Sequence, residues 1–280
     1  MKTILVPVDF SKPSENALRV AANLAKKNQA EIIVLHVMEI AEPLMGTGQY
    51  YVEDQKMLFF MKLGQKKFAE FLDQPFLKEL KVTDSIEIGS TAMGISRTVE
   101  KNQVDLIVMG SKGSSGLEEV LIGSNTEKVV RSSEVPVLVI KNEMKNFDIQ
   151  RMVFASDFGL KNLSAYHKAK KFALDFNAEL KLLYINTPGD KFKSTSEIRE
   201  TMRAFLNNTE IPYSPENIQV FNDYSVDKGV LNAANYLGAD LIAMPTHGRK
   251  GLAHFFSGSI AEDVTNHSEI PVITFKIEME

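Results

Sequence analysis

The chain has 280 residues, 44% of them apolar and 24% charged, which is long enough for two ordinary globular domains. Its net charge of -4 excludes a general attraction to nucleic acid or to anionic membranes. The absence of cysteine excludes disulfide frameworks and thiolate metal sites, and no apolar run is long enough for a signal peptide or a membrane span, so we expect a cytoplasmic protein.

The first half of the chain alternates short apolar runs with amphipathic segments. The short runs are rich in β-branched residues and predict strands buried on both faces, at residues 3–9, 31–38, 85–89, 105–110 and 136–141. The segments with helical spacing are residues 14–28, 53–72, 92–102 and 124–132. Because strands alternate with helices, the pattern predicts βαβ units and a doubly wound parallel sheet.

The second half repeats the first. Residues 104–141 align without a gap on residues 239–276, an offset of 135, and 16 of the 38 positions are identical. Nearer the N-terminus the offset is 148, which places Asp9 on Asp157. The first copy therefore carries 13 additional residues in its middle, which we assign to a loop at residues 42–51.

The duplication predicts an α/β fold made of two tandem flavodoxin-like (Rossmann-like) domains. Each domain is an open five-stranded parallel sheet flanked by helices, and the domains span residues 1–143 and 148–280, with a linker at residues 145–150. The last strands, VPVLVIK and IPVITFK, are apolar sheet edges, so we expect them to pair and to join the copies into an intramolecular pseudo-dimer. Two separate domains on a short linker are the alternative, and pairing of whole chains into a homodimer stays open.

Glycine and serine are concentrated between Gly110 and Gly116. Asp9 and Gly110 each follow or end a predicted strand, so in a flavodoxin-like strand order they face one crevice. Bare backbone there can approach a phosphate, and the helix that begins at Gly123-Ser124 presents free N–H groups to an anion. Two structural alternatives exist, because Ser124 with Glu127 forms a capping-box pattern and Asp9 can cap the first helix.

The spacing Gly110-x2-Gly113-x9-Gly123-Ser124 resembles the nucleotide-binding motif of the universal stress protein family, as do the segments ILVPVDFS, VLHV and GSNTEKVVR. The resemblance covers both copies and implies an ATP site in the crevice. The first-copy residues that would contact ATP are Asp9, Val37, Gly110, Lys112, Gly113, Gly123, Ser124, Asn125 and Thr126. Asp9 also offers a ligand for Mg²⁺. Lys112 is not part of the motif and is added as a countercharge, the alternative being that it is a solvated lysine of the loop.

The second copy departs from this motif, because Pro245 stands where the first glycine belongs. Proline has no N–H to donate, so we expect the second site to be weak, altered or empty. Its remaining candidate residues are Asp157, Gly248, Arg249, Gly258 and Ser259.

Signals for catalysis are weak, since no nucleophile elbow or clustered histidine motif occurs. We therefore interpret the chain as a nucleotide-dependent binding module in a stress response, with adenine nucleotide as its partner, and we do not expect turnover. The alternatives are slow ATP hydrolysis or autophosphorylation, and a non-nucleotide scaffold or lipid-type carrier. The Met- and Phe-rich segment 55–72 could line an apolar groove for such a carrier, although its spacing favours core packing.

Overall fold

The computed structural model describes residues 1–39, 62–111, 123–209, 218–246 and 259–277. The chain divides into two compact units, the first made of Met1–Leu117 with Asn142–Phe147 and the second of Glu118–Lys141 with Asp148–Glu280. Among the described helices, none has the length and apolar character needed to cross a membrane. These units differ from the predicted domains, because residues 118–141 belong to the second unit. The domain boundaries at residues 1–143 and 148–280 remain a prediction.

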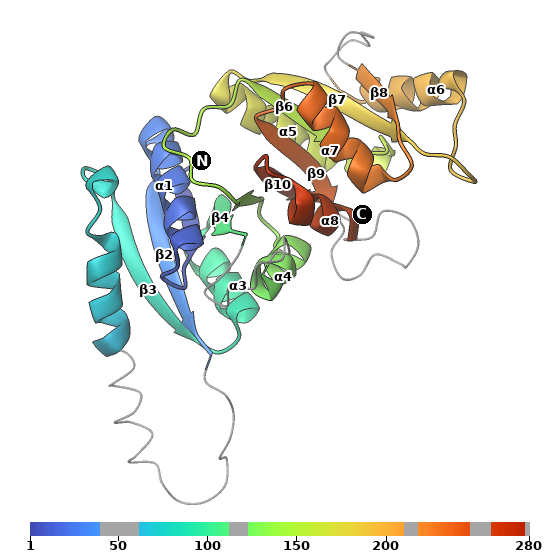
Figure 1. Cartoon of the computed structure of the whole chain (residues 1–280). Coiled ribbons are helices and arrows are strands. Elements are labelled where there is room, and N and C mark those ends of the chain that lie inside the picture. The colour runs from blue at the N-terminus through green and yellow to red at the C-terminus, as the bar shows by residue number, and fades with distance from the viewer. Residues whose placement is uncertain (40–61, 112–122, 210–217, 247–258, 278–280) are drawn as a thin grey trace, which may run out of the picture. The chain divides into compact units, whose positions relative to one another are not determined.

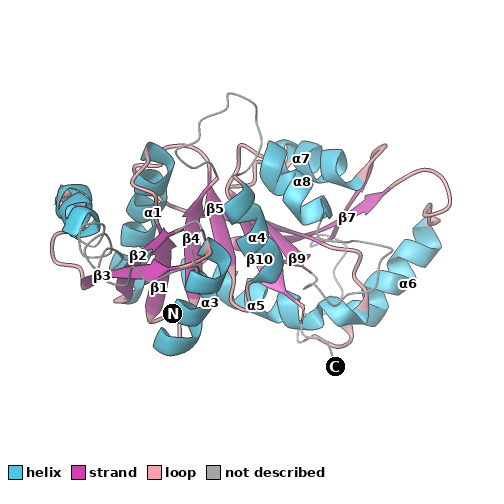
Figure 2. Cartoon of the chain, turned by 90° about the horizontal axis from the view of Figure 1, so that it is seen from below, coloured by secondary structure: helices cyan, strands magenta, loops and turns pink. Residues whose placement is uncertain are grey.

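The first unit contains a parallel sheet with the strand order β3-β2-β1-β4. Figure 2 shows helices on both of its faces, with α1 on one side and α3 on the other. The strands and helices are β1 (Thr3–Pro7), α1 (Lys12–Asn28), β2 (Glu31–Met38), β3 (Val82–Ile88), α3 (Thr91–Asn102) and β4 (Leu106–Gly110). Residues 62–72 are also helical, and a short 3-10 helix follows at Pro75–Leu77.

Helix α1 forms where the sequence predicts it, and its ends explain why. Ser11 is the N-cap, because its side chain accepts a hydrogen bond from the Ser14 N–H at 3.4 Å. Gln29 ends the helix in a left-handed conformation. The small apolar residues that the sequence places on one face, such as Ala17 and Ala21, are fully buried against the sheet.

The second unit contains a larger sheet with the strand order β5-β10-β9-β6-β7-β8. Helix α5 contacts β6, β7, β9 and β10, while α7 and α8 contact each other and cover the opposite face (Figures 1 and 2). The strands are β5 (Val137–Ile140), β6 (Arg151–Ala155), β7 (Glu179–Asn186), β8 (Ile218–Asn222), β9 (Leu241–Thr246) and β10 (Val272–Lys276). The helices are α4 (Ser124–Ser132), a 3-10 turn at Leu160–Asn162, α5 (Leu163–Phe176), α6 (Thr195–Leu206), α7 (Val226–Tyr236) and α8 (Ser259–His267).

The last strands of the two copies pair with each other, as the sequence predicts. Strands β5 and β10 run antiparallel, with Val139 opposite Val272 and Val137 opposite Thr274. All four β5 residues are buried, so the pairing removes two apolar edges from solvent. The predicted α/β fold of two tandem five-stranded copies is confirmed, and the second sheet is mixed because of this one antiparallel pair.

One local prediction is wrong, and one structural alternative does not hold. Strand β3 is not buried on both faces, because it is the outermost strand of its sheet and most of its side chains are partly or fully exposed. Ser124 is not the N-cap of α4 and forms no capping box with Glu127. Gly123 takes the extended N-cap conformation instead, and its carbonyl accepts the Glu127 N–H at 3.1 Å, so Ser124 is the first helical residue.

The Met- and Phe-rich segment packs as core rather than as an open groove over its described part. Phe68 is buried, and its ring meets the Phe10 ring edge-on at a centroid distance of 5.2 Å. Leu72 is half-buried, while residues 55–61 lie outside the described ranges.

Helices α4 and α8 hold equivalent positions in the two copies and pack against each other within the second unit. Burial, and then the negative charge of nearby Glu127, raises the pKa of Glu262 above its usual value of 4.5, while Arg131 opposes the shift. The Glu262 carboxyl therefore ionises more readily in the unfolded chain than in the folded one. It lowers the free energy of unfolding as the pH rises above 4.5, and it has no effect at a pH well below 4.5, where it is protonated in both states.

We therefore expect Glu262→Gln to raise the free energy of unfolding at pH 7 by up to about 1 kcal/mol, the scale of a partly exposed charge interaction. The gain should vanish near pH 4, where the carboxyl is protonated in both states. Urea denaturation at the two pH values measures this, with Glu200→Gln on the exposed face of α6 as the control. A gain that is equal at both pH values would show that packing, and not charge, is responsible.

Candidate functional site

The strand order reverses at one place in each copy. In the first unit β1 lies between β2 and β4, and in the second unit β6 lies between β7 and β9. Ligands of open parallel sheets bind beyond the carboxyl ends of the strands that flank such a reversal. These strand ends carry Asp9 and Gly110 in the first copy, and Asp157 and Pro245 in the second.

Gly110 is required by packing at its strand end. A Cβ atom built on this residue would lie 2.7 Å from the carbonyl oxygen of Pro13, at the start of α1. Because that contact is with backbone, α1 would have to move to accept any side chain here. In the second copy, Pro245 stands at the position of Gly110, and the segment equivalent to the start of α1 forms the 3-10 turn Leu160–Asn162.

Asp9 fixes the turn between β1 and α1. Its Oδ1 accepts hydrogen bonds from the Ser11 N–H at 3.1 Å and the Ser11 hydroxyl at 2.5 Å, so it supports the residue that caps α1 without being the cap itself. Phe10 follows with φ of 65°, in the left-handed region that non-glycine residues seldom adopt. Its ring lies 4.6 Å from that of His36, which holds the turn in place.

The other residues predicted for the first site are placed as follows. Val37 is half-buried near the end of β2, the strand beside β1. Gly123, Ser124, Asn125 and Thr126 form the start of α4 in the second unit, and the Thr126 side chain is buried. Lys112 and Gly113 lie outside the described residues. The structure thus brings Asp9, Val37 and Gly110 together at the carboxyl ends of β1, β2 and β4. The complete site remains a prediction.

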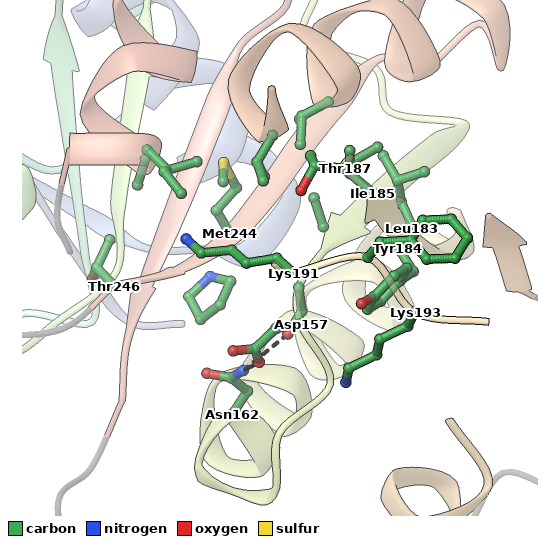
Figure 3. Close-up of a pocket in the computed structure, with 18 of the residues that line it drawn as sticks. Asp157, Asn162, Leu183, Tyr184, Ile185, Thr187, Lys191, Lys193, Met244 and Thr246 are labelled. Atoms are coloured by element: carbon green, nitrogen blue, oxygen red, sulfur yellow. Dashed lines mark hydrogen bonds between the residues drawn. The ribbon is translucent and has the colours of Figure 1, made fainter. Parts of the chain in front are cut away.

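A cavity of about 440 Å³ opens at the strand reversal of the second copy (Figure 3). Its apolar wall comes from β7, β9, α7 and the start of α8. Its polar groups come from β7, from the ends of β6 and β9, from the loop after β7, from the 3-10 turn at Leu160–Asn162 and from α6. The residues on which the argument below depends are Asp157, Asn162, Tyr184, Ile185, Lys191, Lys193, Met244 and Pro245.

Asp157 lies at the cavity with its carboxylate held by main-chain and side-chain donors (Figure 3). Oδ1 accepts hydrogen bonds from the Gly159 N–H at 2.9 Å and from Asn162 Nδ2 at 2.5 Å, and Oδ2 lies 3.6 Å from Lys161 Nζ. Phe158 follows with φ of 55°, which repeats the left-handed turn after Asp9. Both copies therefore turn the chain in the same way to place this aspartate beyond the first strand.

The hydroxyl of Tyr184 stays protonated at neutral pH. Burial raises its pKa above 10.0, and the negative charges of Asp157 and Glu197 raise it further. Glu197 is itself fixed at the start of α6, where it forms a capping box with Ser194. The cavity thus combines apolar surface with neutral hydroxyl, carboxylate and ammonium groups, which suits a ligand that has an apolar ring and several polar substituents.

Of the residues predicted for the second site, Asp157 is at the cavity and Ser259 begins α8, while Gly248, Arg249 and Gly258 lie outside the described ranges. The sequence analysis missed Lys191, Lys193 and Asn162. The fall in offset between the copies shows only that the segment after the second strand is shorter in the second copy, and it does not point to the two lysines. In the described part of the chain, no group of three or more metal-binding side chains occurs, and Asp9 as a ligand of Mg²⁺ remains a prediction.

Comparison with known proteins supports the same division into two copies. Two universal stress proteins of Methanocaldococcus jannaschii match about half of this chain: one is 31% identical over 144 residues (51% of this chain and 84% of the relative), and the other is 33% identical over 155 residues (51% and 96%). The crystal structure of a universal stress protein from Archaeoglobus fulgidus is 25% identical and covers 98% of this chain and 96% of its own, with a TM-score of 0.65. The model of the universal stress protein family matches residues 1–141 and again residues 148–276, so the chain belongs to the universal stress protein family.

Proposed function

We propose that this protein binds ATP and acts in the cytoplasm as a nucleotide-dependent regulatory module of a stress response. The observation that carries the proposal is the cavity at the strand reversal of the second copy, with Asp157 on its lining. The first copy has the same strand order and the same aspartate turn, and it retains the complete glycine motif that the second copy has lost. The first copy is therefore the better ATP site by sequence, and the cavity of the second copy supports a crevice at the same place in the fold.

In the first copy, the residues would divide the nucleotide between them. Asp9 would accept a hydrogen bond from a ribose hydroxyl, and the backbone of Val37 would meet the adenine ring. Gly110, Gly113 and Gly123 would let main-chain N–H groups approach the ribose and phosphates. The start of α4, from Ser124 to Thr126, would add hydroxyl and amide donors, and Lys112 would add a positive charge. A bound Mg²⁺ would neutralise part of the phosphate charge, with Asp9 as its protein ligand.

Calorimetry and thermal denaturation of the full chain test the proposal. ATP at a hundredfold excess over Kd should stabilise the fold by about 2.7 kcal/mol. We expect Gly123→Leu to remove most of this stabilisation, since a side chain there would enter the phosphate loop. Gly258→Leu, the matched variant of the second copy, should have a small effect.

Two results would contradict the proposal. Two equivalent ATP sites in the wild type would show that Pro245 does not weaken the second copy. Loss of ATP binding in Gly258→Leu but not in Gly123→Leu would show that ATP binds to the second copy and not to the first.

The apolar wall of the second cavity favours a second candidate function, the binding of an apolar ligand in place of a nucleotide. Leu183, Ile185 and Met244 all contribute to this wall and are buried. Under this alternative the purified protein should carry no adenine absorbance, and ATP should leave the melting temperature unchanged.

A further inference from the structure

The two copies hold the aspartate after their first strand with different donors. In the first copy, Asp9 Oδ1 accepts hydrogen bonds from both the N–H and the hydroxyl of Ser11. Glycine stands at the position of Ser11 in the second copy, so Gly159 gives Asp157 an N–H at 2.9 Å but no hydroxyl. The second donor is Asn162, whose Nδ2 lies 2.5 Å from Asp157 Oδ1 (Figure 3). An amide has thus taken the place of the hydroxyl.

Asn162 is fixed in this contact by its burial and by a second acceptor. It is 2% exposed at the end of the 3-10 turn, and its Nδ2 also donates to the Ser156 hydroxyl at 3.0 Å. Its Oδ1 is buried and has no hydrogen-bond partner among the described residues. The reverse orientation of the amide would turn that oxygen toward the Asp157 carboxylate, which would repel it. The amide is therefore held with its donor group on the aspartate.

The neighbouring positions differ between the copies in a consistent way. Ser14 occupies the place of Asn162 in the first copy, and its hydroxyl donates its single hydrogen to the Ser11 carbonyl at 2.8 Å. Val8 occupies the place of Ser156, and its side chain has no acceptor. The first copy therefore holds its aspartate from Ser11, and the second holds its aspartate from Asn162 with the support of Ser156.

Both of these donors bind the same oxygen of Asp157. Oδ1 receives the Gly159 N–H and the Asn162 amide, whereas Oδ2 lies 3.6 Å from Lys161 Nζ, which is too far for a hydrogen bond. Asp157 also lines the cavity. Oδ2 is therefore the carboxylate oxygen to which a hydroxyl of a ligand can donate.

We propose that Asn162 is a positioning residue of the second cavity, which holds Oδ1 of Asp157 so that Oδ2 accepts a hydrogen bond from a sugar hydroxyl of a bound nucleoside. This inference rests on the proposed function, because it takes the ligand of the second cavity to contain a nucleoside. The second copy thus keeps the role of its aspartate although it has lost the serine that supports the equivalent residue in the first copy.

A tryptophan at the cavity can report binding in the second copy alone, because the chain has no tryptophan of its own. Phe192 lines the cavity and is 62% exposed, so we expect Phe192→Trp to be tolerated. Adenosine is the probe, because it carries the sugar hydroxyls and no phosphate. In this background, we expect Asn162→Ser to weaken adenosine binding by about tenfold, the scale of one lost hydrogen bond to a charged group.

Adding Gly159→Ser to Asn162→Ser should restore the affinity, because the double variant has the pair of residues found in the first copy. The backbone of Gly159 suits a serine, since its φ of -65° and ψ of 146° are close to the -79° and 164° of Ser11. A Cβ there would lie 3.3 Å from Asp157 Oδ1, which brings a hydroxyl within reach of that oxygen. A role of Asn162 in packing alone would not be replaced by a hydroxyl at another position.

Two further variants test the donor itself. Asn162→Asp keeps the size of the side chain but replaces the donor by a carboxylate, so it should weaken adenosine binding at least as much as Asn162→Ser. Asn208→Ala removes an exposed amide just after α6, away from the cavity lining, and should leave the affinity unchanged. Circular dichroism checks that each variant folds. Full affinity in Asn162→Asp, or no recovery in a folded double variant, would overturn the inference.

The outcome is separable from that of the proposed function. A tryptophan signal that does not respond to adenosine, in a protein whose ATP binding still depends on Gly123, overturns this inference alone. A response to adenosine that depends on Asn162, in a protein with no Gly123-dependent ATP binding, overturns the proposed function of the first copy and leaves this inference standing.

Discussion

Replacing Phe158 by alanine should lower the free energy of unfolding by about 3–4 kcal/mol, the typical cost of removing a fully buried aromatic ring. Phe158 is 1% exposed, and its ring meets Phe205 edge-on at a centroid distance of 5.2 Å and Phe154 at 6.3 Å. These contacts also hold the residue at its positive φ, an unfavourable conformation that only surrounding structure can maintain. Urea denaturation followed by circular dichroism measures the loss.

Phe10 is the matched control for Phe158, since it occupies the same turn of the first copy. It is only half-buried, although its ring contacts His36 and Phe68. We expect Phe10→Ala to cost about half as much as Phe158→Ala, because less apolar surface returns to water. An equal or larger cost for Phe10→Ala would show that burial does not set the difference.

Phe158→Ala should also affect ligand binding in the second copy. Phe158 directs the turn in which Gly159 donates to Asp157, so the loosened turn would no longer hold the carboxylate at the cavity. Calorimetric titration with adenosine should therefore show weaker binding to Phe158→Ala than to the wild type.

Gly229→Val should destabilise the protein by about 3 kcal/mol, at the upper end of the range for overpacked cores. A Cβ on Gly229 would lie 2.6 Å from Ile185 Cγ2 and 3.0 Å from Asp223 Cβ, so α7 would have to move away from β7. Ile185 also forms part of the cavity wall, and the movement should change the cavity as well as the stability.

Lys228→Val is the matched control, because it introduces the same β-branched residue at an exposed position one residue earlier on α7. Its cost should be the small helix-propensity difference of less than about 1 kcal/mol. A cost for Gly229→Val no larger than that of the control would show that α7 can shift freely on the sheet.

The first copy contains the same packing arrangement as the second. A Cβ on Gly94 would lie 2.9 Å from Val37 Cγ2, and Gly94 and Val37 align with Gly229 and Ile185 in the second copy. In both copies, a glycine lets the helix after the third strand approach the second strand closely. The residue proposed to meet adenine is therefore backed by this helix, which restricts its movement.

Several features of the site were predictable because they depend on local sequence. Asp9 and Asp157 were identified from their place after an apolar run, and the structure puts both at the reversal of the strand order. The pairing of the last strands was predictable because each is an apolar edge that needs a partner. The family was also recognisable from the glycine spacing, which the family match confirms.

Other features depend on contacts between segments that are distant in the chain. The reason for Gly110 is a 2.7 Å approach to Pro13, which no local pattern reveals. Lys191 comes to the cavity from the loop after β7 and Asn162 from the 3-10 turn before α5, and only the tertiary fold brings them together. Helix α4 begins at Ser124 as predicted, but Gly123 and not Ser124 is its N-cap, because helix ends respond to their surroundings as well as to propensity.

By itself, the sequence determined the duplication, the order of strands and helices, and the position of an aspartate beyond the first strand of each copy. These properties follow from periodicity and self-similarity, which are carried by neighbouring residues. Only the tertiary structure decided that the second copy retains an open cavity despite Pro245, and that a lysine from the loop after β7 crosses it. The reason is physical: the shape and charge of a cavity come from side chains that meet across several strands and loops, and their meeting depends on the whole fold.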